Sequence, residues 1–453
     1  MTASSRRLRF FLGAFGEPGH AFPMLALGAR LAERGHHVSF ETWSRWREHV
    51  EQAGMRFLPA PESPLFRGPE DAPEMYQAVV LATGQTRVAL SASRPDAVIH
   101  DILTLAPAMA GELEGVPVAT LVPHVYPVGA PGAPVYAVGA RLPRTRAGQA
   151  TWSAVARMTE GGLRQGRAQL NETRAKLGLA PVEWLHGGLS RQLCLVATFP
   201  QLEYPRRWPG GVHVVGPLMW EPPFGPVAPP AGEGPLILVA PSTAQDPEHR
   251  LLRAALAGLG GEPVRVLATF NRRPISGPVE VPANARLVDW VSYSRTMPEC
   301  ALVICHAGHG TMARALACGC PVVAVPHAGD MAENAARADW SGTGVRLPWR
   351  ALRPGTLRLA VRRALAQPSI GVRARELATW AAANDGASRA ADLVEELALG
   401  ARQPSSGSPG RARTNSISSG ESPSTTSIGS PAQLHSSTTA RSSVTSRARQ
   451  SAP

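Results

Sequence analysis

Two series of short apolar runs constrain the fold of this 453-residue chain more than any other feature. Apolar runs of about four to eight residues between Gly- and Pro-rich turns are typical of buried parallel strands, and helical periodicity between them predicts crossover helices. The first series predicts strands at 8–15, 38–42, 97–100 and 116–121. The second predicts strands at 236–240, 264–268, 286–288, 301–305 and 321–325. The sequence therefore predicts an α/β chain with two Rossmann-like, doubly wound sheets.

Changes in composition along the chain predict its domain boundaries. A stretch rich in Pro, Gly and Trp separates the two series, so we predict a linker at 206–235 between an N-terminal domain at 1–205 and a C-terminal domain at 236–370. Residues 371–400 are predicted to form helices. Residues 401–453 are rich in Ser, Thr and Arg with almost no large apolar side chains, which predicts a disordered tail.

Overall composition argues against several classes of partner. The formal net charge is +12, but six Arg and one Glu place +5 of it in residues 401–453, and the remaining +7 is too dispersed to predict nucleic-acid binding. The five cysteines lie mostly in apolar contexts without zinc-site or thioredoxin spacing, so we predict no metal site and a reduced, cytoplasmic location. No apolar run approaches the ~20 residues that cross a bilayer, so no integral membrane association is expected.

A histidine stands between the first predicted strand and the first predicted helix. The loop from Gly13 to Pro23 follows the carboxyl end of a strand, where α/β folds bind ligands, and it contains His20. A neutral imidazole, with an ordinary pKa of ~6.5, can take a proton from a hydroxyl if a second group fixes its tautomer. His20 is therefore a candidate general base. A helix-capping or solvated histidine is the alternative interpretation.

A carboxylate ends another strand of the same predicted sheet. Asp101 follows the apolar run at 97–100, and the carboxyl ends of parallel strands meet at one edge of a sheet. Asp101 could therefore orient and charge-balance His20. An N-cap of the following helix is an equally good interpretation of Asp101.

The glycines of the first loop also allow a different enzyme class. Gly13, Gly16 and Gly19 resemble a dinucleotide fingerprint, but their spacing is Gly-x-x-Gly-x-x-Gly. Thr42 and Trp43 stand after the second strand, where such a site needs an acidic residue for the ribose. A nicotinamide-dependent oxidoreductase is therefore the weaker alternative, and we predict no cofactor.

The most specific motif lies in the second half of the chain. Residues 303–311 read Val-Ile-Cys-His-Ala-Gly-His-Gly-Thr, which predicts a strand, a turn of small residues and a helix that starts at about Thr311. Main-chain N–H groups and the dipole at a helix start favour an anion, and Gly308 and Gly310 would let a phosphate approach the main chain. The motif predicts a diphosphate site that works without a metal ion.

These three motifs occur in the order found in a known family. Over residues 8 to about 395 the chain resembles the UDP-glycosyltransferase superfamily (glycosyltransferase family 1), especially the actinobacterial members that glycosylate macrolides and similar natural products. The resemblance implies the GT-B fold, in which two Rossmann-like domains face each other across a cleft. It implies an acceptor bound mainly by the N-terminal domain, a nucleotide-sugar donor bound by the C-terminal domain, and helices at 371–400 that pack back across the junction.

The resemblance also assigns roles to individual residues. His20 matches the catalytic base of the family and Asp101 its partner carboxylate. Asp330 and Met331 match positions that bind the donor sugar. The remaining positions match the donor nucleotide and phosphate site: Ser242, Thr243, Trp290, Val291, His306, Gly308, His309, Gly310 and Thr311.

Three positions depart from the family's pattern. Ser292 and Tyr293 stand where Pro-Gln is common, Met331 where a sugar-binding Gln is common, and Arg314 where a ribose-binding Glu is common. A guanidinium carries only donors, so Arg314 would bind ribose hydroxyls poorly; alternatively, it turns to solvent and another residue binds the ribose. We therefore expect either a UDP-sugar or a dTDP-sugar as co-substrate.

Together these features predict an inverting, metal-independent glycosyltransferase that moves a hexose or deoxyhexose to a hydroxyl of a small apolar acceptor. The predicted acceptor regions, 60–95 and 124–190, contain Met75, Tyr76, Tyr126, Tyr136 and Trp152. A non-catalytic nucleotide-sugar-binding or auxiliary protein of the same fold is the alternative. That protein would be expected to lack His20, Asp101 or His306.

Overall fold

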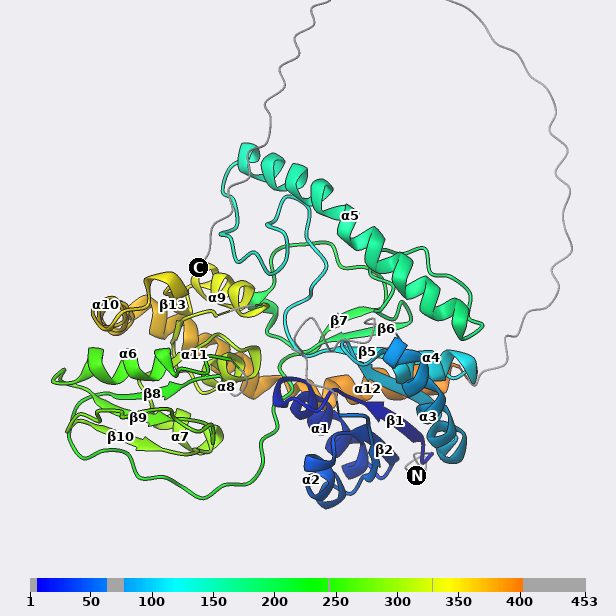
Figure 1. The fold of residues 1–453 in the computed structure, drawn as a ribbon, viewed down its shortest axis with the longest axis horizontal. Helices are drawn as coiled ribbons and strands as arrows, with labels where there is room; N and C mark the ends of the chain where they lie inside the picture. The colour runs from blue at the N-terminus through cyan, green and yellow to red at the C-terminus, as the bar shows by residue number, and fades with distance from the viewer. Residues whose placement is uncertain (1–5, 63–76, 243–244, 328, 402–453) are drawn as a thin grey trace, which may run out of the picture. The chain divides into compact units, whose positions relative to one another are not determined.

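The computed structural model describes residues 6–62, 77–242, 245–327 and 329–401, which contain two parallel β-sheets (Figure 1). The first sheet has seven strands in the order β3-β2-β1-β4-β5-β6-β7. The second has six strands in the order β10-β9-β8-β11-β12-β13. Neighbouring strands run parallel throughout both sheets. The predicted α/β class with two doubly wound sheets is confirmed.

The first sheet and its helices come from residues 9–214. The strands are β1 (Arg9–Gly13), β2 (His37–Thr42), β3 (Arg56–Pro59), β4 (Ala97–Asp101), β5 (Val118–Val122), β6 (Leu193–Val196) and β7 (Val212–Val214). The helices are α1 (Pro18–Glu33), α2 (Arg47–Gln52), α3 (Gln77–Ser93), α4 (Leu105–Leu113) and α5 (Arg146–Lys176), with 3-10 turns at Ser44–Trp46 and Pro200–Leu202.

The second sheet and its helices come from residues 236–366. The strands are β8 (Leu236–Ala240), β9 (Arg265–Thr269), β10 (Ala285–Val288), β11 (Leu302–Cys305), β12 (Val322–Ala324) and β13 (Gly344–Arg346). The helices are α6 (Arg250–Leu259), α7 (Tyr293–Thr296), α8 (His309–Ala317), α9 (Met331–Ser341) and α10 (Pro354–Ala366), with 3-10 turns at Met297–Glu299 and Trp349–Ala351. Two more helices follow, α11 (Pro368–Ala383) and α12 (Gly386–Gly400).

Both faces of the first sheet are buried under helices. Phe10 and Leu12 of β1 lie in one core cluster with residues of α1, whereas Phe11 between them lies in another with Leu90 of α3 and Ala110 of α4. Successive side chains of a strand point to opposite faces, so this alternation places helices on both sides of the sheet. β1 and β4 are paired neighbours, and the loops that follow them therefore meet at the same edge.

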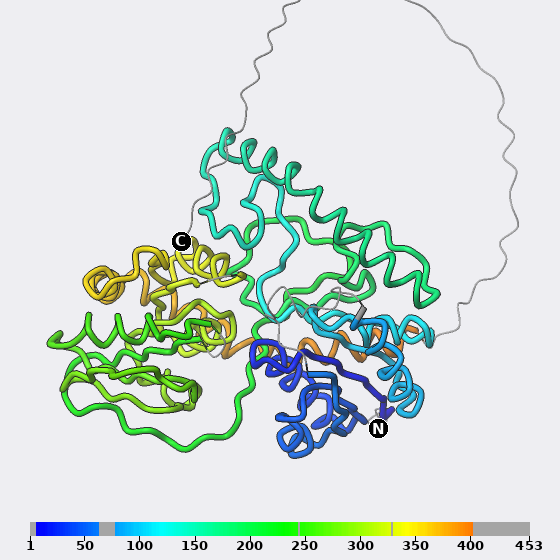
Figure 2. The backbone as a smooth tube through the Cα atoms, in the orientation of Figure 1, coloured from blue at the N-terminus to red at the C-terminus, as the bar shows by residue number. Residues whose placement is uncertain are grey.

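The last two described helices pack on different sheets. α11 contacts α8 of the second half, whereas α12 contacts α1, β4 and β6 of the first half. Ala391, Val394 and Ala398 of α12 belong to the core cluster of the first sheet. The chain therefore returns from the second sheet to the first, and the orange C-terminal trace in Figure 2 runs close to the blue α1.

One strand lies inside the stretch predicted as a linker. β7 (Val212–Val214) pairs with β6, so the first sheet extends into the predicted linker at 206–235 and past the domain boundary predicted at residue 205. Its three residues are only half-buried, which explains the weak apolar signal. The other domain boundaries stay predictions. The predicted disordered tail at 401–453 lies, apart from Ala401, outside the described residues.

No helix among the described residues is long and apolar enough to cross a membrane. The five cysteines are free, and four of them are buried, as expected for small core residues. The described part of the chain contains no group of three or more His, Cys, Asp or Glu side chains that could hold a metal ion.

Candidate active site

His20 and Asp101 form a hydrogen-bonded pair at the edge where β1 and β4 end. His20 lies in the first turn of α1, and its Nδ1 is 2.8 Å from Oδ1 of the fully buried Asp101. Because a carboxylate only accepts, the proton of the neutral ring lies on Nδ1 and Nε2 keeps a lone pair. The second carboxylate oxygen accepts from the main-chain N–H of Leu103, and Thr104, not Asp101, is the N-cap of α4. Asp101 is therefore the partner of His20, and its interpretation as a helix cap was wrong.

The surroundings of His20 favour its protonated form. Burial lowers the pKa of the His20 ring, but the Asp101 carboxylate raises it by charge and by hydrogen bonding, with further contributions from Asp330 and Glu17. The net result is a pKa above the ordinary value. The His20 ring is thus a stronger base than a free imidazole, and its side chain remains 17% exposed.

The His20 ring lines a cavity of about 300 Å³ between the two halves of the molecule. Pro18, Phe22 and Pro123 of the first half also line it, next to residues of the second half. Twelve predicted site positions line this cavity: His20, Ser242, Trp290, Val291, His306, Gly308, His309, Gly310, Thr311, Arg314, Asp330 and Met331. Asp101 sits behind His20, and Thr243 lies outside the described residues. The structure thus brings together residues that are more than three hundred positions apart in the sequence, from His20 to Met331.

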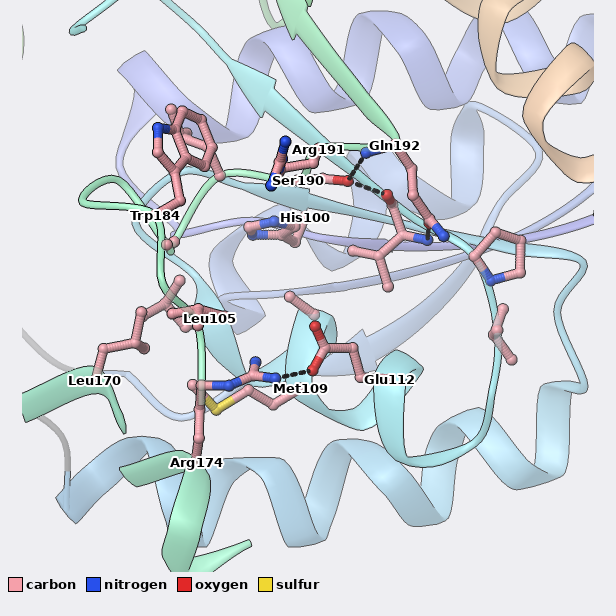
Figure 3. Close-up of a pocket in the computed structure, with 18 of the residues that line it drawn as sticks. His100, Leu105, Met109, Glu112, Leu170, Arg174, Trp184, Ser190, Arg191 and Gln192 are labelled. Carbon is pink, nitrogen blue, oxygen red and sulfur yellow. Dashed lines mark hydrogen bonds and ion pairs between the residues drawn. The ribbon is translucent and has the colours of Figure 1, made fainter. Parts of the chain in front are cut away.

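A larger cavity, of about 620 Å³, lies elsewhere in the first half (Figure 3). Leu105 and Met109 of α4 and Trp184 form its apolar wall, and Arg174 of α5 pairs with Glu112 at 2.7 Å. This cavity shares no lining residue with the His20 cavity and contains none of the predicted site residues. Size alone does not identify a catalytic site, so we assign the chemistry to the smaller cavity, where the predicted residues converge.

The helix start predicted to bind phosphate lies two residues earlier than expected. α8 begins at His309 with Gly308 as its N-cap, not at Thr311. Ala307 has a left-handed backbone (φ 60°), a conformation that costs a non-glycine residue about 1 kcal/mol or more and closes the turn early. Beyond the adjacent residues and the backbone of α8 itself, no atom lies within 4 Å of the Cβ position of Gly308 or Gly310. The main chain at the start of α8 is therefore open to a ligand, as the motif predicted.

His306 holds the loop that carries Ser242. Its Nδ1 accepts from the main-chain N–H of Ser242 at 2.9 Å, and its Nε2 lies 3.3 Å from Oδ2 of Asp246. Burial lowers the pKa of His306, against the opposing effect of Asp246, and the side chain is 2% exposed. Both ring nitrogens therefore face protein groups, so His306 positions the Ser242 loop beside the predicted phosphate site.

The His309 side chain has a different use from the one predicted. Its Nε2 donates to the main-chain carbonyl of Ala197, at the end of β6, over 3.2 Å. Burial lowers the pKa of His309 to about 4, so the ring stays neutral. The side chain thus links α8 to the first sheet, and only the main-chain N–H of His309 remains at the helix start for a phosphate.

An acidic residue that the sequence analysis missed fixes the predicted nucleobase loop. Glu221, from the stretch predicted as a linker, accepts from the hydroxyl of Ser292 at 2.6 Å and from the main-chain N–H groups of Tyr293 and Ser294 at 3.1 Å. Burial by itself raises the pKa of Glu221. The hydrogen bonds and the charge of Arg314 have a larger, opposite effect, so the net pKa lies below the ordinary value and the carboxylate stays ionised. Arg314 is half-buried and lines the same cavity as Glu221, and which residue binds the ribose stays a prediction.

The predicted donor-sugar residues begin α9, and a buried arginine anchors that helix to the first half. Nη1 of Arg337 donates to Leu202 O and to Glu203 Oε2, each at 2.9 Å, while its Nε donates to Glu333 Oε1 at 2.9 Å. The Arg337 side chain is only 2% exposed. Asp330, one residue before α9, accepts from the amide of Asn334 at 3.0 Å. The network ties α9, which starts at the predicted sugar-binding positions, to the first half.

The apolar and aromatic residues predicted for the acceptor pocket lie in different environments. Met75 and Tyr76 lie outside the described residues. Tyr126 is buried in a core cluster and does not line the cavity. Tyr136 stacks on His124, with ring centroids 6.0 Å apart, and His124 itself lines the cavity. His124 was not predicted as a site residue, because its position after the strand β5 was the only local signal for such a role.

Comparison with known proteins places the chain in a family. Residues 252–397 match the family model of the erythromycin biosynthesis protein CIII-like C-terminal domain. The chain is 31% identical over 435 residues to O-mycaminosyltylonolide 6-deoxyallosyltransferase of Streptomyces fradiae, and the match covers 86% of this chain and 98% of that protein.

Solved structures share the same architecture. The glycotransferase of kitacinnamycin has a TM-score of 0.71 and 20% identity, covering 86% of this chain and 99% of its own. The glycosyltransferase VinC, solved in complex with dTDP, has a TM-score of 0.64 and 20% identity, covering 86% of this chain and 100% of its own. These likenesses confirm the predicted GT-B fold. The chain belongs to the UDP-glycosyltransferase superfamily, alongside the actinobacterial antibiotic glycosyltransferases, and is a glycosyltransferase.

Proposed function

We propose that the enzyme moves a hexose or deoxyhexose from a UDP- or dTDP-sugar to a hydroxyl of a small apolar acceptor, with inversion and without a divalent ion. The observation that carries the proposal is the His20–Asp101 pair, whose imidazole lines the same cavity as the start of α8. A displacement at an anomeric carbon needs a base for the acceptor and an anion-stabilising group for the leaving diphosphate. This cavity carries one of each.

His20 is the proposed general base. Asp101 accepts the Nδ1–H, so the Nε2 lone pair takes the proton of the acceptor hydroxyl while that oxygen bonds to the anomeric carbon. The bond from the anomeric carbon to the diphosphate oxygen breaks, and its electron pair leaves with the diphosphate from the opposite side. A single in-line displacement of this kind inverts the configuration at the anomeric carbon.

The start of α8 is the proposed site for the departing diphosphate. Main-chain N–H groups at Gly308, His309 and Gly310 are open to the cavity, and the helix dipole places partial positive charge there. His306 holds Ser242 beside these N–H groups, because its Nδ1 accepts a hydrogen bond from the main-chain N–H of Ser242. These fixed dipoles would stabilise the negative charge that develops as the bond breaks, which is the work that a divalent ion does in other transferases.

The acceptor class is proposed from the cavity wall and from one relative. Phe22, Leu218, Met219 and Trp220 line the cavity, with the ring centroids of Phe22 and Trp220 5.0 Å apart, and an apolar wall favours an apolar acceptor. The relative that is 31% identical is named for transfer of 6-deoxyallose to O-mycaminosyltylonolide. Both observations support a secondary metabolite with a free hydroxyl as the acceptor.

Inhibition by free nucleotides tests the proposed donor specificity. Arg314 stands near the ionised Glu221 and offers only donors, so selection for a ribose 2′-hydroxyl should be weak. VinC, of the same fold, binds dTDP. We expect free UDP and free dTDP to inhibit with comparable constants, and turnover to continue in excess chelator. A preference for UDP of about 10-fold or more, worth ~1.4 kcal/mol, would contradict weak selection for the ribose 2′-hydroxyl. Loss of turnover in chelator that magnesium restores would refute metal independence.

A further inference from the structure

His124 brings a second imidazole from the first half into the cavity that holds His20. It follows β5, which pairs with β4, so the loop carrying His124 lies beside the end of the strand that carries Asp101. None of the roles proposed above uses His124. Its ring stacks on Tyr136, and the Tyr136 hydroxyl is 3.3 Å from Nδ1.

Local hydrogen bonding fixes the tautomer of His124. Its Nδ1 lies 2.8 Å from the main-chain carbonyl of Val125, and because a carbonyl only accepts, the ring proton lies on Nδ1. Burial lowers the pKa of His124, an effect that the nearby Asp330 carboxylate opposes without reversing. The ring is therefore neutral, and Nε2 is left as a hydrogen-bond acceptor that carries no proton.

A second acceptor faces the same space from the other half of the molecule. The Asp330 carboxylate lines the same cavity as His20, His124 and His309, and its charge favours the protonated forms of these three rings. Two acceptors that share one small cavity need a ligand that brings donors. A sugar hydroxyl can donate to one of them, and a neighbouring hydroxyl can donate to the other.

We propose that His124 is a specificity-determining residue for the donor sugar, whose Nε2 accepts a hydrogen bond from one sugar hydroxyl across the cavity from Asp330. The inference rests on the proposed function in so far as Asp330 marks the sugar site. It extends that function, because the first half of the molecule then selects the sugar as well as binding the acceptor. A donor that lacks this hydroxyl would leave a desolvated acceptor unpaired, and its affinity would fall about 10- to 100-fold.

Donor binding without acceptor tests this directly. The wild type, His124→Phe and His124→Gln are titrated calorimetrically with one nucleotide-sugar and with analogues that each lack one sugar hydroxyl. Phe keeps the ring against Tyr136 and removes Nε2, whereas Gln keeps an acceptor at a similar reach. We expect the wild type to reject one analogue by about 10- to 100-fold, His124→Phe to lose this selection against that analogue alone, and His124→Gln to retain part of it. Affinity for the free nucleotide should not change.

Controls separate this role from a structural one. His186→Phe makes the same substitution at another half-buried histidine, which contacts Trp184 outside the cavity, and should leave all donor affinities unchanged. An equal loss for every donor in His124→Phe, or no loss at all, would overturn the proposal. An unchanged donor affinity with a raised KM for the acceptor would overturn it too, and would assign His124 to the acceptor. If the wild type bound nucleotide-sugars but transferred none, the proposed function would fail, and the titrations would still decide the role of His124. If the wild type bound no nucleotide-sugar, the proposed function and the proposed role of His124 would both fail.

Discussion

Replacing His20 with alanine is expected to lower kcat by about 100- to 10,000-fold while affinity for the donor barely changes. The imidazole lines the cavity and its Nδ1–H is held by Asp101, so its loss removes the proposed proton acceptor and leaves the start of α8 intact. Steady-state kinetics with a simple alcohol acceptor measure the loss, and titration with free nucleotide provides the control. Full activity of the variant would remove His20 from the mechanism.

The pH dependence of the same step follows from the His20 environment. The base works only when neutral, so kcat/KM should rise with pH through an apparent pKa above ~6.5, because Asp101 holds the pKa of His20 above its ordinary value. Asp101→Asn removes the charge that raises this pKa and leaves the burial that lowers it. The rising limb should therefore move to lower pH, while kcat falls by up to about 10,000-fold because the tautomer is no longer fixed.

Replacing Arg337 with methionine is expected to destabilise the folded enzyme by about 3–5 kcal/mol. The guanidinium is almost completely buried and joins Glu203 of the first half to Glu333 of α9, so its loss leaves the buried Glu333 without this partner and Glu203 with the more distant Arg206, at 3.9 Å. The midpoint of urea unfolding measures the effect. Because α9 begins at Met331, next to Asp330, donor affinity should weaken as well.

Two further variants make the Arg337 result specific. Arg373→Met removes a surface arginine that pairs with the exposed Glu376, and it should cost no more than about 1 kcal/mol. Replacing Glu333 with glutamine in the Arg337→Met background should recover part of the stability, since its unpaired charge is then gone, whereas Glu203 keeps its ion pair with Arg206. Equal, small losses for Arg337→Met and Arg373→Met would show that the buried network does not hold the two halves together.

Much of the fold was predictable because its signals are local. Buried parallel strands are continuous apolar runs, so β8 was predicted with its observed bounds and β11 within one residue of its observed start. β7 was missed because only three half-buried residues form it. The start of α8 was placed two residues late because a left-handed Ala307 closes the turn, and alanine gives no sequence signal for that conformation.

The site was predictable where a motif follows a strand directly, as for His20 and Asp101. Glu221, His124 and Arg337 were not predicted, because each depends on contacts between segments that are distant in the sequence. The Glu221 carboxylate reaches Ser292, which is 71 positions away, and Arg337 reaches Glu203 over 134 positions. Such pairings depend on how the two sheets are placed against each other, which local patterns do not specify.

The configuration of the glycosidic product tests the central claim most directly. The enzyme is incubated, in excess chelator, with a gluco-configured donor whose sugar is α-linked to the diphosphate and with an apolar alcohol acceptor. The product is then examined by proton NMR at its anomeric centre. Direct displacement by an acceptor activated by His20 predicts a β-linked product, with the large diaxial coupling of its anomeric proton. An α-linked product would contradict the account, since retention requires a different mechanism from one in-line attack.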